Sequence, residues 1–189
     1  MTGTTIKKLQ NTRPPNKDAA LILDDGSVFW GNGAGAQIST TGELCFNTSI
    51  TGYQEIMTDP SYAGQIIIFT FPHIGNTGTN PEDNENTEPA ARGCIFAADV
   101  TDPSSWRSTQ HLNVWLKNHN LTAITGIDTR RLTRRIRDIG FANATIVKDP
   151  TELNLALKKT KEFGSLEGMD LAKEVTCDHT YKWNESTWS

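Results

Sequence analysis

Short apolar runs separated by polar turns fill the first half of the chain. Their β-branched and aromatic content predicts strands at 19–23, 27–30, 42–49, 65–71 and 94–98. Asp25-Gly26 lies between the first two runs, a pair typical of a tight hairpin turn. Two further strands are expected in the second half, at 121–124 and 144–147.

A glycine-rich stretch, Gly31–Ala36, follows the second run. Its spacing fits the loose form G-x-G-x-x-G/A of a dinucleotide-binding loop, but such a loop must open a helix that receives the pyrophosphate. The next residues, Ser39–Gly42, show no helical apolar period. We therefore interpret the glycine-rich stretch as a flexible turn.

Helical spacing is clearer in the second half of the chain. Residues 109–118 place their large apolar side chains on one face, with Ser108 as the expected cap. Asp149 is the expected cap of another helix, because a proline follows it at the first helical position and an acid at the third. A shorter helix is expected over 51–57, capped by its first residue. Strands early and helices late favour an α+β class with a layered β/β/α arrangement.

The most basic element is a helix expected to begin after Asp128 and to continue to Ile139. Its apolar stripe consists of Leu132, Ile136 and Ile139. Three arginines lie on the face opposite that stripe: Arg130, Arg134 and Arg137. Two more, Arg131 and Arg135, flank the stripe. This face is either solvated or an interface for an anionic protein, because arginine pairs well with carboxylates.

Composition narrows the possible functions. The 189 residues are 36% apolar and carry a net charge of −4, which disfavours a nucleic-acid or membrane-surface partner. No apolar run approaches the length of a membrane span, and no signal peptide is evident, so we expect a cytoplasmic protein. Cys45 and Cys94 lie inside expected strands and are interpreted as buried thiols. No metal-ligand spacing, P-loop or G-x-S-x-G motif occurs.

The polar stretches 47–55 and 58–62 combine short hydroxyls and amides with glycine and tyrosine. Such groups suit hydrogen bonding to a small polar molecule, although turn and capping chemistry explains many of them equally well. They do not by themselves supply a base and a nucleophile.

Four long runs carry a resemblance: residues 46–62, 71–76, 126–134 and 166–175. They resemble the N-terminal domain of the carbamoyl-phosphate synthase small chain. The resemblance implies a three-layer, swivelling-type β/β/α domain over 19–165. It leaves 1–18 as a disordered basic tail and 166–189 as a linker toward a class I glutamine amidotransferase domain. The Cys and His–Glu motifs of that second domain, G-x-C-x-G and H-x-E, do not occur in this sequence.

The resemblance also implies roles for individual residues. Ser61, in the family's D-P-S-Y motif, is expected at the L-glutamine pocket. Ser49 and Ile50 match the segment near the start of the ammonia passage. The basic face formed by Arg130, Arg134 and Arg137 is expected to meet the large chain.

By the same resemblance, the whole enzyme makes carbamoyl phosphate from glutamine, bicarbonate and ATP for pyrimidine and arginine biosynthesis. ATP and Mg²⁺ are then used by the large subunit, and we expect no cofactor, metal or catalytic residue in this chain. Alone, it is expected to be inactive. The alternative is a free-standing, non-catalytic interaction module on the same scaffold.

Overall fold

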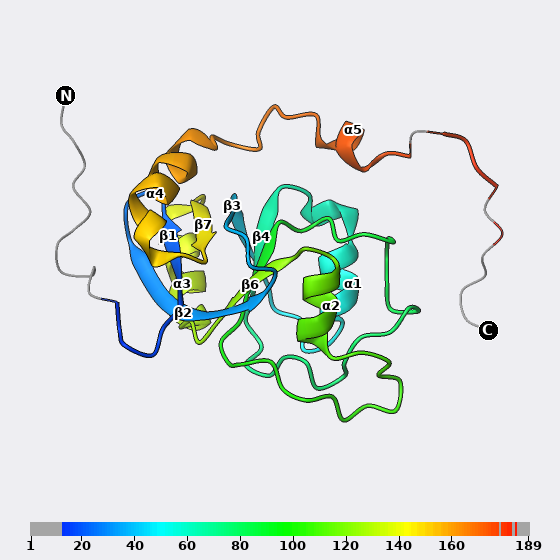
Figure 1. The fold of residues 1–189 in the computed structure, drawn as a ribbon. Helices are drawn as coiled ribbons and strands as arrows, with labels where there is room; N and C mark the ends of the chain where they lie inside the picture. Colours follow the sequence, from blue (N-terminus) through cyan, green and yellow to red (C-terminus); the bar gives the residue numbers. More distant parts are fainter. Residues whose placement is uncertain (1–12, 178, 183, 185–189) are drawn as a thin grey trace.

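The strands of this protein pair into one closed sheet. The computed structural model describes residues 13–177, 179–182 and 184 (Figure 1). Seven strands of that region follow one another around a barrel in the order β1-β2-β6-β5-β4-β3-β7. Their bounds are β1 Ala19–Leu23, β2 Val28–Gly35, β3 Thr40–Asn47, β4 Gln65–Phe69, β5 Gly93–Ile95, β6 Thr122–Thr125 and β7 Asn143–Val147.

Strand direction divides the barrel into two parts. Strands β3, β4, β5 and β6 are parallel to one another, so their carboxyl ends meet at the same end of the barrel. The hairpin of β1 and β2, predicted from Asp25-Gly26, is confirmed. β7 closes the ring by pairing antiparallel with β1 on one side and with β3 on the other.

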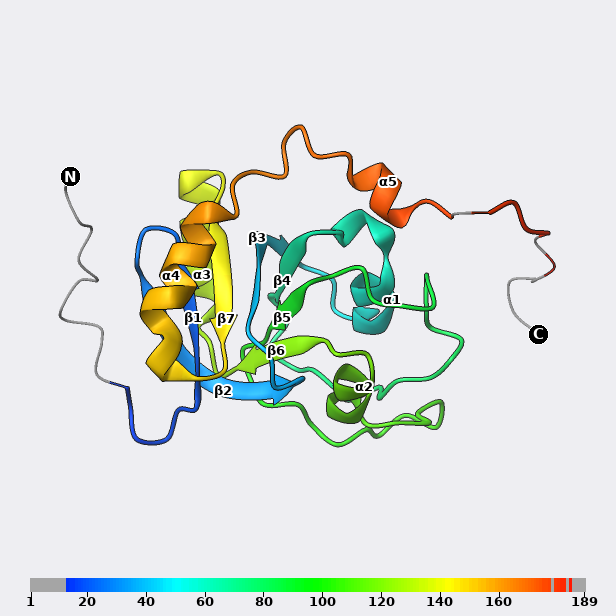
Figure 2. The same ribbon diagram turned by 45° about the horizontal axis from the view of Figure 1, so that its top comes forward.

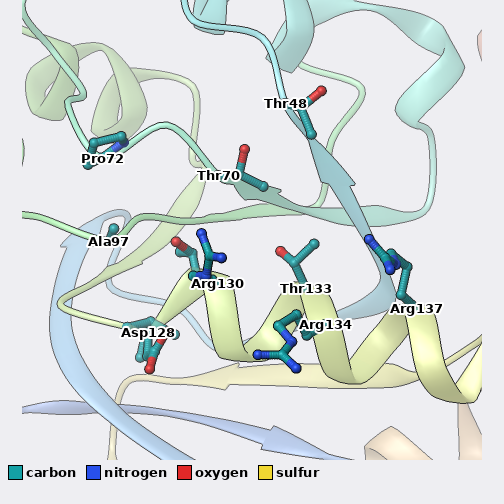
Figure 3. A pocket seen from close by; sticks show the side chains of 11 residues that line it. Thr48, Thr70, Pro72, Ala97, Asp128, Arg130, Thr133, Arg134 and Arg137 are labelled. Carbon is teal, nitrogen blue, oxygen red and sulfur yellow. The ribbon is translucent and has the colours of Figure 1, made fainter.

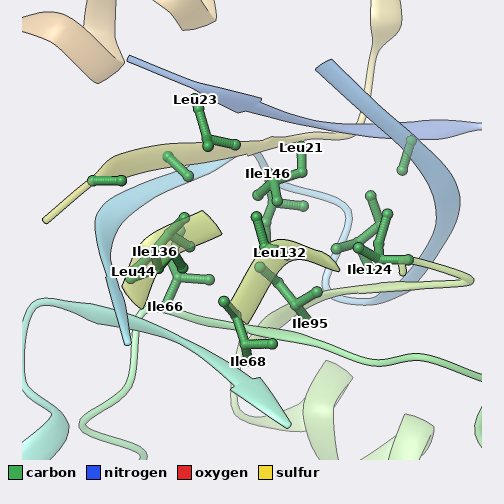
Figure 4. Packing of buried hydrophobic residues seen from close by; sticks show 14 residues of the cluster. Leu21, Leu23, Leu44, Ile66, Ile68, Ile95, Ile124, Leu132, Ile136 and Ile146 are labelled. Carbon is green, nitrogen blue, oxygen red and sulfur yellow. The ribbon is translucent and has the colours of Figure 1, made fainter. Parts of the chain in front are cut away.

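Helices cover the outside of the barrel, and one of them contributes side chains to its interior (Figures 1 and 2). Helices α1 (Tyr53–Thr58) and α2 (Leu112–Asn118) share one buried cluster with the outer sides of β4, β5 and β6. Helix α4 (Leu153–Glu162) follows the short turn η2 (Pro150–Glu152) and packs on β1 and β7. Helix α3 (Thr129–Ile139) sends Leu132 and Ile136 into the interior cluster (Figure 4). The last element is the short helix α5 (Leu171–Val175).

The mixture of helices and strands confirms the broad class, but the strand arrangement differs from the expected three layers. Two stacked sheets were expected, and the structure has one sheet that closes on itself. The reason is β7, which hydrogen-bonds to both neighbours and so joins the two halves. Pairing between strands so distant in sequence leaves no mark in the apolar pattern of either strand.

The glycine-rich stretch is part of a strand, so its interpretation as a flexible turn was wrong. Residues 31–35 continue β2 and pair with β1 and β6. A Cβ on Gly31 would lie 2.4 Å from the carbonyl oxygen of Thr125 and 2.7 Å from Cγ1 of Ile124. Glycine is needed here because two strands and the segment after β6 approach too closely for a side chain.

Two of the predicted helix caps were wrong and two are confirmed. Helix α2 begins later than expected, and Nδ1 of His111, rather than Ser108, accepts the N–H of Asn113. Helix α1 starts after Gly52, whose φ of 80° makes the turn without a side-chain cap. Asp128 and Asp149 cap their turns as predicted.

Within the residues that the structure describes, no helix is both long enough and apolar enough to cross a bilayer. Residues 72–89 form a long loop with neither helix nor strand, apart from an isolated bridge between Thr79 and Gln110. Of the expected basic tail, residues 1–12 lie outside the described residues.

Candidate functional site

A groove of about 700 Å³ opens at the end of the barrel where the four parallel strands finish (Figure 3). Four of its lining residues, Thr48, Thr70, Ala97 and Ile127, come from the segments that follow β3, β4, β5 and β6. The opposite wall is helix α3. We call this feature the α3 groove. The carboxyl edge of parallel strands is where open α/β sheets commonly bind ligands, because the chain leaves the sheet there in loops.

Helix α3 is fixed by its ends and by its buried side. Asp128 Oδ1 accepts the N–H of Arg131 at 2.9 Å, and Gly140, with a φ of 83°, ends the helix. Leu132 is fully buried, as predicted. Ile139 was expected to face inward as well, but 54% of it is exposed because the helix ends at this residue, outside the interior cluster.

The five arginines of α3 fall into two groups. Arg135 donates hydrogen bonds to the carboxylate of Asp25 and, at 3.0 Å, to the hydroxyl of Ser27. Arg131 lies over the ring of Phe29, 5.8 Å from its centre. These two side chains therefore hold the helix against the hairpin of β1 and β2.

The other three arginines line the α3 groove: Arg130, Arg134 and Arg137. All three are exposed. In the part of the chain that the structure describes, no carboxylate lies within ion-pair distance of any of them. The basic face predicted from the sequence is therefore an exposed cationic surface, and its three arginines form no ion pairs within the described residues.

Ser61, the residue matched to the glutamine pocket, is exposed in the 3-10 turn η1 (Pro60–Tyr62). Its backbone N–H donates to Asp59 Oδ1 at 2.8 Å, which fixes the turn. Among the described residues, no group accepts or donates a hydrogen bond at its hydroxyl. The side chain therefore faces solvent with its hydrogen-bonding capacity unused.

Ser49 and Ile50, matched to the ammonia passage, directly follow β3. Both are exposed, and 68% of Ile50 is accessible. Asn47, the last residue of β3, accepts the N–H of Ser49 on Oδ1 at 2.8 Å and donates from Nδ2 to the hydroxyl of Tyr62 at 2.9 Å. This pair of hydrogen bonds joins the segment carrying Ser49 and Ile50 to the turn carrying Ser61.

The segment after α4 runs toward the same turn. Asn143 Nδ2 donates to the carbonyl oxygen of Gly164 at 2.6 Å, which holds the start of the segment. Leu166 then packs over Gly64, where a Cβ would lie 2.9 Å from Leu166 Cδ2. Gly64 follows η1 closely, so the chain passes beside η1 on its way to α5 (Figure 2).

Neither strand cysteine is suited to nucleophilic chemistry. Cys94 is fully buried, and burial raises the pKa of its thiol far above the ordinary value. Burial, with a contribution from nearby Glu43, raises the pKa of Cys45 to about 12. Both thiols are therefore protonated at neutral pH. Within the described residues, no group of three or more His, Cys, Asp or Glu side chains is placed to hold a metal ion.

Sequence reasoning missed part of the groove. Thr70 and Thr133 were not singled out, and Thr48 was noted only as part of a polar stretch. A usable signal was present, since Thr48 and Thr70 each follow an apolar strand. Recognising it required knowing that β3 and β4 are parallel neighbours.

Comparison with known families places this chain in one of them. The model for "Carbamoyl-phosphate synthase small chain, CPSase domain" matches residues 21–146, about two thirds of the chain. The chain therefore belongs to the carbamoyl-phosphate synthase small-chain family, of which it carries the N-terminal CPSase domain. This confirms the resemblance found in the sequence.

Individual relatives agree. The carbamoyl phosphate synthase small chain of Ruegeria pomeroyi is 52% identical over 174 residues, which cover 90% of this chain and 45% of that protein. The Rhizobium meliloti protein is 50% identical, with 90% and 44% covered. The Salmonella typhimurium protein is 49% identical, with 92% and 46% covered. The chain thus spans less than half the length of these relatives.

Proposed function

We propose that this chain is the non-catalytic N-terminal domain of the small subunit of glutamine-hydrolysing carbamoyl-phosphate synthase. It docks the small subunit to the large one and forms one rim of the glutamine site and ammonia passage. The observation that carries this proposal is the joining of the two matched segments by the hydrogen bond between Asn47 and Tyr62. Thr48, which lies between Asn47 and Ser49, lines the α3 groove, so the segment that carries Ser49 and Ile50 borders the arginine face of α3 as well.

Ser61 is suited to the glutamine rim because its hydroxyl is exposed on a turn that the backbone holds in place. The segment that passes beside η1 supports this role, since it directs the following half of a small chain toward Ser61. One hydroxyl can supply one hydrogen bond to the side-chain amide or carboxylate of glutamine. The hydrolysis itself belongs to the amidotransferase domain.

Ser49 and Ile50 suit the entrance of an ammonia passage. Ammonia is small and neutral, and it must be kept from water and protons until it is used. An exposed apolar side chain beside a small hydroxyl can be covered by the partner subunit to form such a lining. ATP, Mg²⁺ and bicarbonate are handled by the large subunit in this scheme, in the cytoplasm.

The test uses the full small chain paired with its large chain. Ser61→Ala should lower kcat/KM for glutamine by about two- to tenfold, the loss of one neutral hydrogen bond of roughly 0.5–1.5 kcal/mol. Ser104→Ala, in the loop after β5, is the matched control and should leave the value unchanged. Equal values for both variants would show that the Ser61 hydroxyl does not contact glutamine.

The proposal also predicts that the 189-residue chain by itself releases no ammonia from glutamine. Robust deamidation by the purified chain would contradict it. A free-standing interaction module, the alternative, would bind a partner through the α3 groove but would never accompany glutamine-dependent synthesis. Copurification with a large chain that makes carbamoyl phosphate therefore separates the two functions.

A further inference from the structure

We propose that the α3 groove binds an acidic polypeptide segment, whose carboxylates pair with Arg130, Arg134 and Arg137. The inference rests on the docking function proposed above, and it assigns that segment to the large subunit. It specifies the chemistry of the contact, which the docking function alone leaves open.

The distribution of charge favours an acidic partner. The chain as a whole has a net charge of −4. Its solubility therefore does not depend on the cationic face of α3. Of the arginines on α3, Arg131 and Arg135 have contacts within the fold. The three in the groove form no ion pair in the described region, although the capping residue Asp128 also lines the groove. Their mutual repulsion destabilises the free helix slightly and is relieved when anions bind.

The spacing of the three arginines favours a polypeptide over a single small anion. Arg130, Arg134 and Arg137 recur at helical intervals along one face, which spreads their guanidinium groups over about 10 Å of helix at 1.5 Å per residue (Figure 3). A single phosphate needs cations that converge on one point. A row of separated cations instead matches several separate carboxylates carried by one polypeptide, and arginine binds each of them in a bidentate manner.

The lining between the arginines and the strands has both polar and apolar groups. Thr133 Oγ1 is buried and, within the described residues, has no hydrogen-bond partner. Thr48 and Thr70 add hydroxyls from the ends of two strands, and Pro72 and Ile127 add apolar surface. A polypeptide offers amide groups for the hydroxyls and aliphatic carbons for the apolar wall. An inorganic anion offers neither, so a peptide segment fits the groove better.

The experiment measures the affinity of the full small chain for the large chain at about 0.1 M and about 0.5 M salt. Three forms are compared: the parent, the triple variant Arg130→Glu/Arg134→Glu/Arg137→Glu, and the control Lys158→Glu/Lys159→Glu/Lys161→Glu. The control changes the net charge equally, on exposed lysines of α4. The groove variant should bind at least about tenfold more weakly at low salt, and its affinity should lose most of its salt dependence. The control should stay within about threefold of the parent.

A photoreactive benzophenone amino acid in place of Thr48 identifies what lies in the groove. The cross-linked large-chain peptide should contain at least two Asp or Glu residues. A cross-linked peptide without acids would overturn the inference, as would a groove variant that pairs like the parent. Millimolar inorganic pyrophosphate that binds the parent, but leaves pairing unchanged, would assign the groove to a small anion instead.

The failure of this inference is distinguishable from that of the docking function. If the parent chain does not pair with the large chain at all, the docking function fails and the inference fails with it. If the parent pairs and the groove variant pairs equally well, docking stands and only the acidic segment is wrong. A thermal unfolding curve of the groove variant that matches the parent excludes misfolding as the cause of weakened pairing.

Discussion

The side-chain amide of Asn47 donates a 2.9 Å hydrogen bond to the hydroxyl of Tyr62, and so ties the end of β3 to the turn η1. Both side chains are partly buried. Removing one partner leaves the other poorly solvated, so either loss should cost free energy.

We expect Tyr62→Phe to lower the free energy of unfolding by about 1 kcal/mol. Asn47→Ala should cost a similar or larger amount, because Asn47 also holds the N–H of Ser49. Urea unfolding of the two single variants and the double variant gives the coupling energy. A coupling near zero would show that the hydrogen bond contributes nothing to stability.

Leu132 and Ile139 offer a matched pair on helix α3. Leu132 is fully buried in the interior cluster, whereas 54% of Ile139 is exposed. Leu132→Asp buries an unpaired charge and should lower the stability by several kcal/mol. Ile139→Asp should change it by less than about 1 kcal/mol. Thermal unfolding checks both, and a Leu132→Asp variant that melts like the parent would remove α3 from the core.

Gly31 and Gly33 provide a second pair, two residues apart on β2. A Cβ on Gly31 would meet the backbone oxygen of Thr125, which cannot move without shifting a strand end. A Cβ on Gly33 would meet Nζ of Lys148, a side-chain atom that is hydrogen-bonded to Ala34 and Ala123 but can shift without moving a strand. Gly31→Ala should therefore cost about 1–3 kcal/mol by overpacking, and Gly33→Ala clearly less. Equal midpoints in urea would contradict the close approach at Gly31.

Lys148 should make stability depend on pH. Its ammonium group donates to the carbonyl oxygens of Ala34 and Ala123, at 2.8 and 3.0 Å. Burial lowers its pKa to about 8, against the attraction of nearby Asp18. Below pH 8 both the folded and the unfolded chain hold the proton. Above pH 8 the folded chain releases it while the unfolded chain keeps it to about pH 10.5. The cost of burying the charge is therefore relieved, and the free energy of unfolding rises with pH through that window.

The variant Lys148→Met isolates this effect, because its other titrating groups are those of the parent. Between pH 7 and about 9.5, the parent should gain on the order of 1 kcal/mol of stability relative to the variant, since water screens the partly exposed ammonium group. Urea unfolding at three pH values measures the difference. Parallel pH profiles would show that Lys148 is solvated in the folded chain.

The elements that the sequence predicts best are those whose signals are local. Asp128 and the spacing of Leu132 and Ile136 define α3 within a dozen positions, and the structure has the helix where these residues place it. The glycine-rich part of β2 failed for the opposite reason. Gly31 is fixed by contacts with Thr125 and Ile124, which are far away in the sequence and touch it only once the barrel has closed.

In the candidate site too, some residues have a local sequence signal and others do not. The arginine face of α3 follows from helical periodicity alone, and the structure adds only which arginines the fold already uses. Ser61, Ser49 and Ile50 were found through the family resemblance, since a hydroxyl on a turn has no distinguishing pattern of its own. The hydroxyl of Thr133 could not be found from sequence, because its burial and lack of a partner depend on the strand ends packed against α3.

Because β7 pairs with both β1 and β3, each of the seven described strands has a neighbour on either side. A protein that binds this domain cannot extend the sheet by adding a strand of its own, the route by which many extended peptides are recognised. A binding partner must instead contact side chains and loops. Single substitutions at the surface should therefore be able to abolish binding while the hydrogen bonds between the strands stay intact. The same closure protects the domain from edge-to-edge aggregation when it is handled apart from a partner.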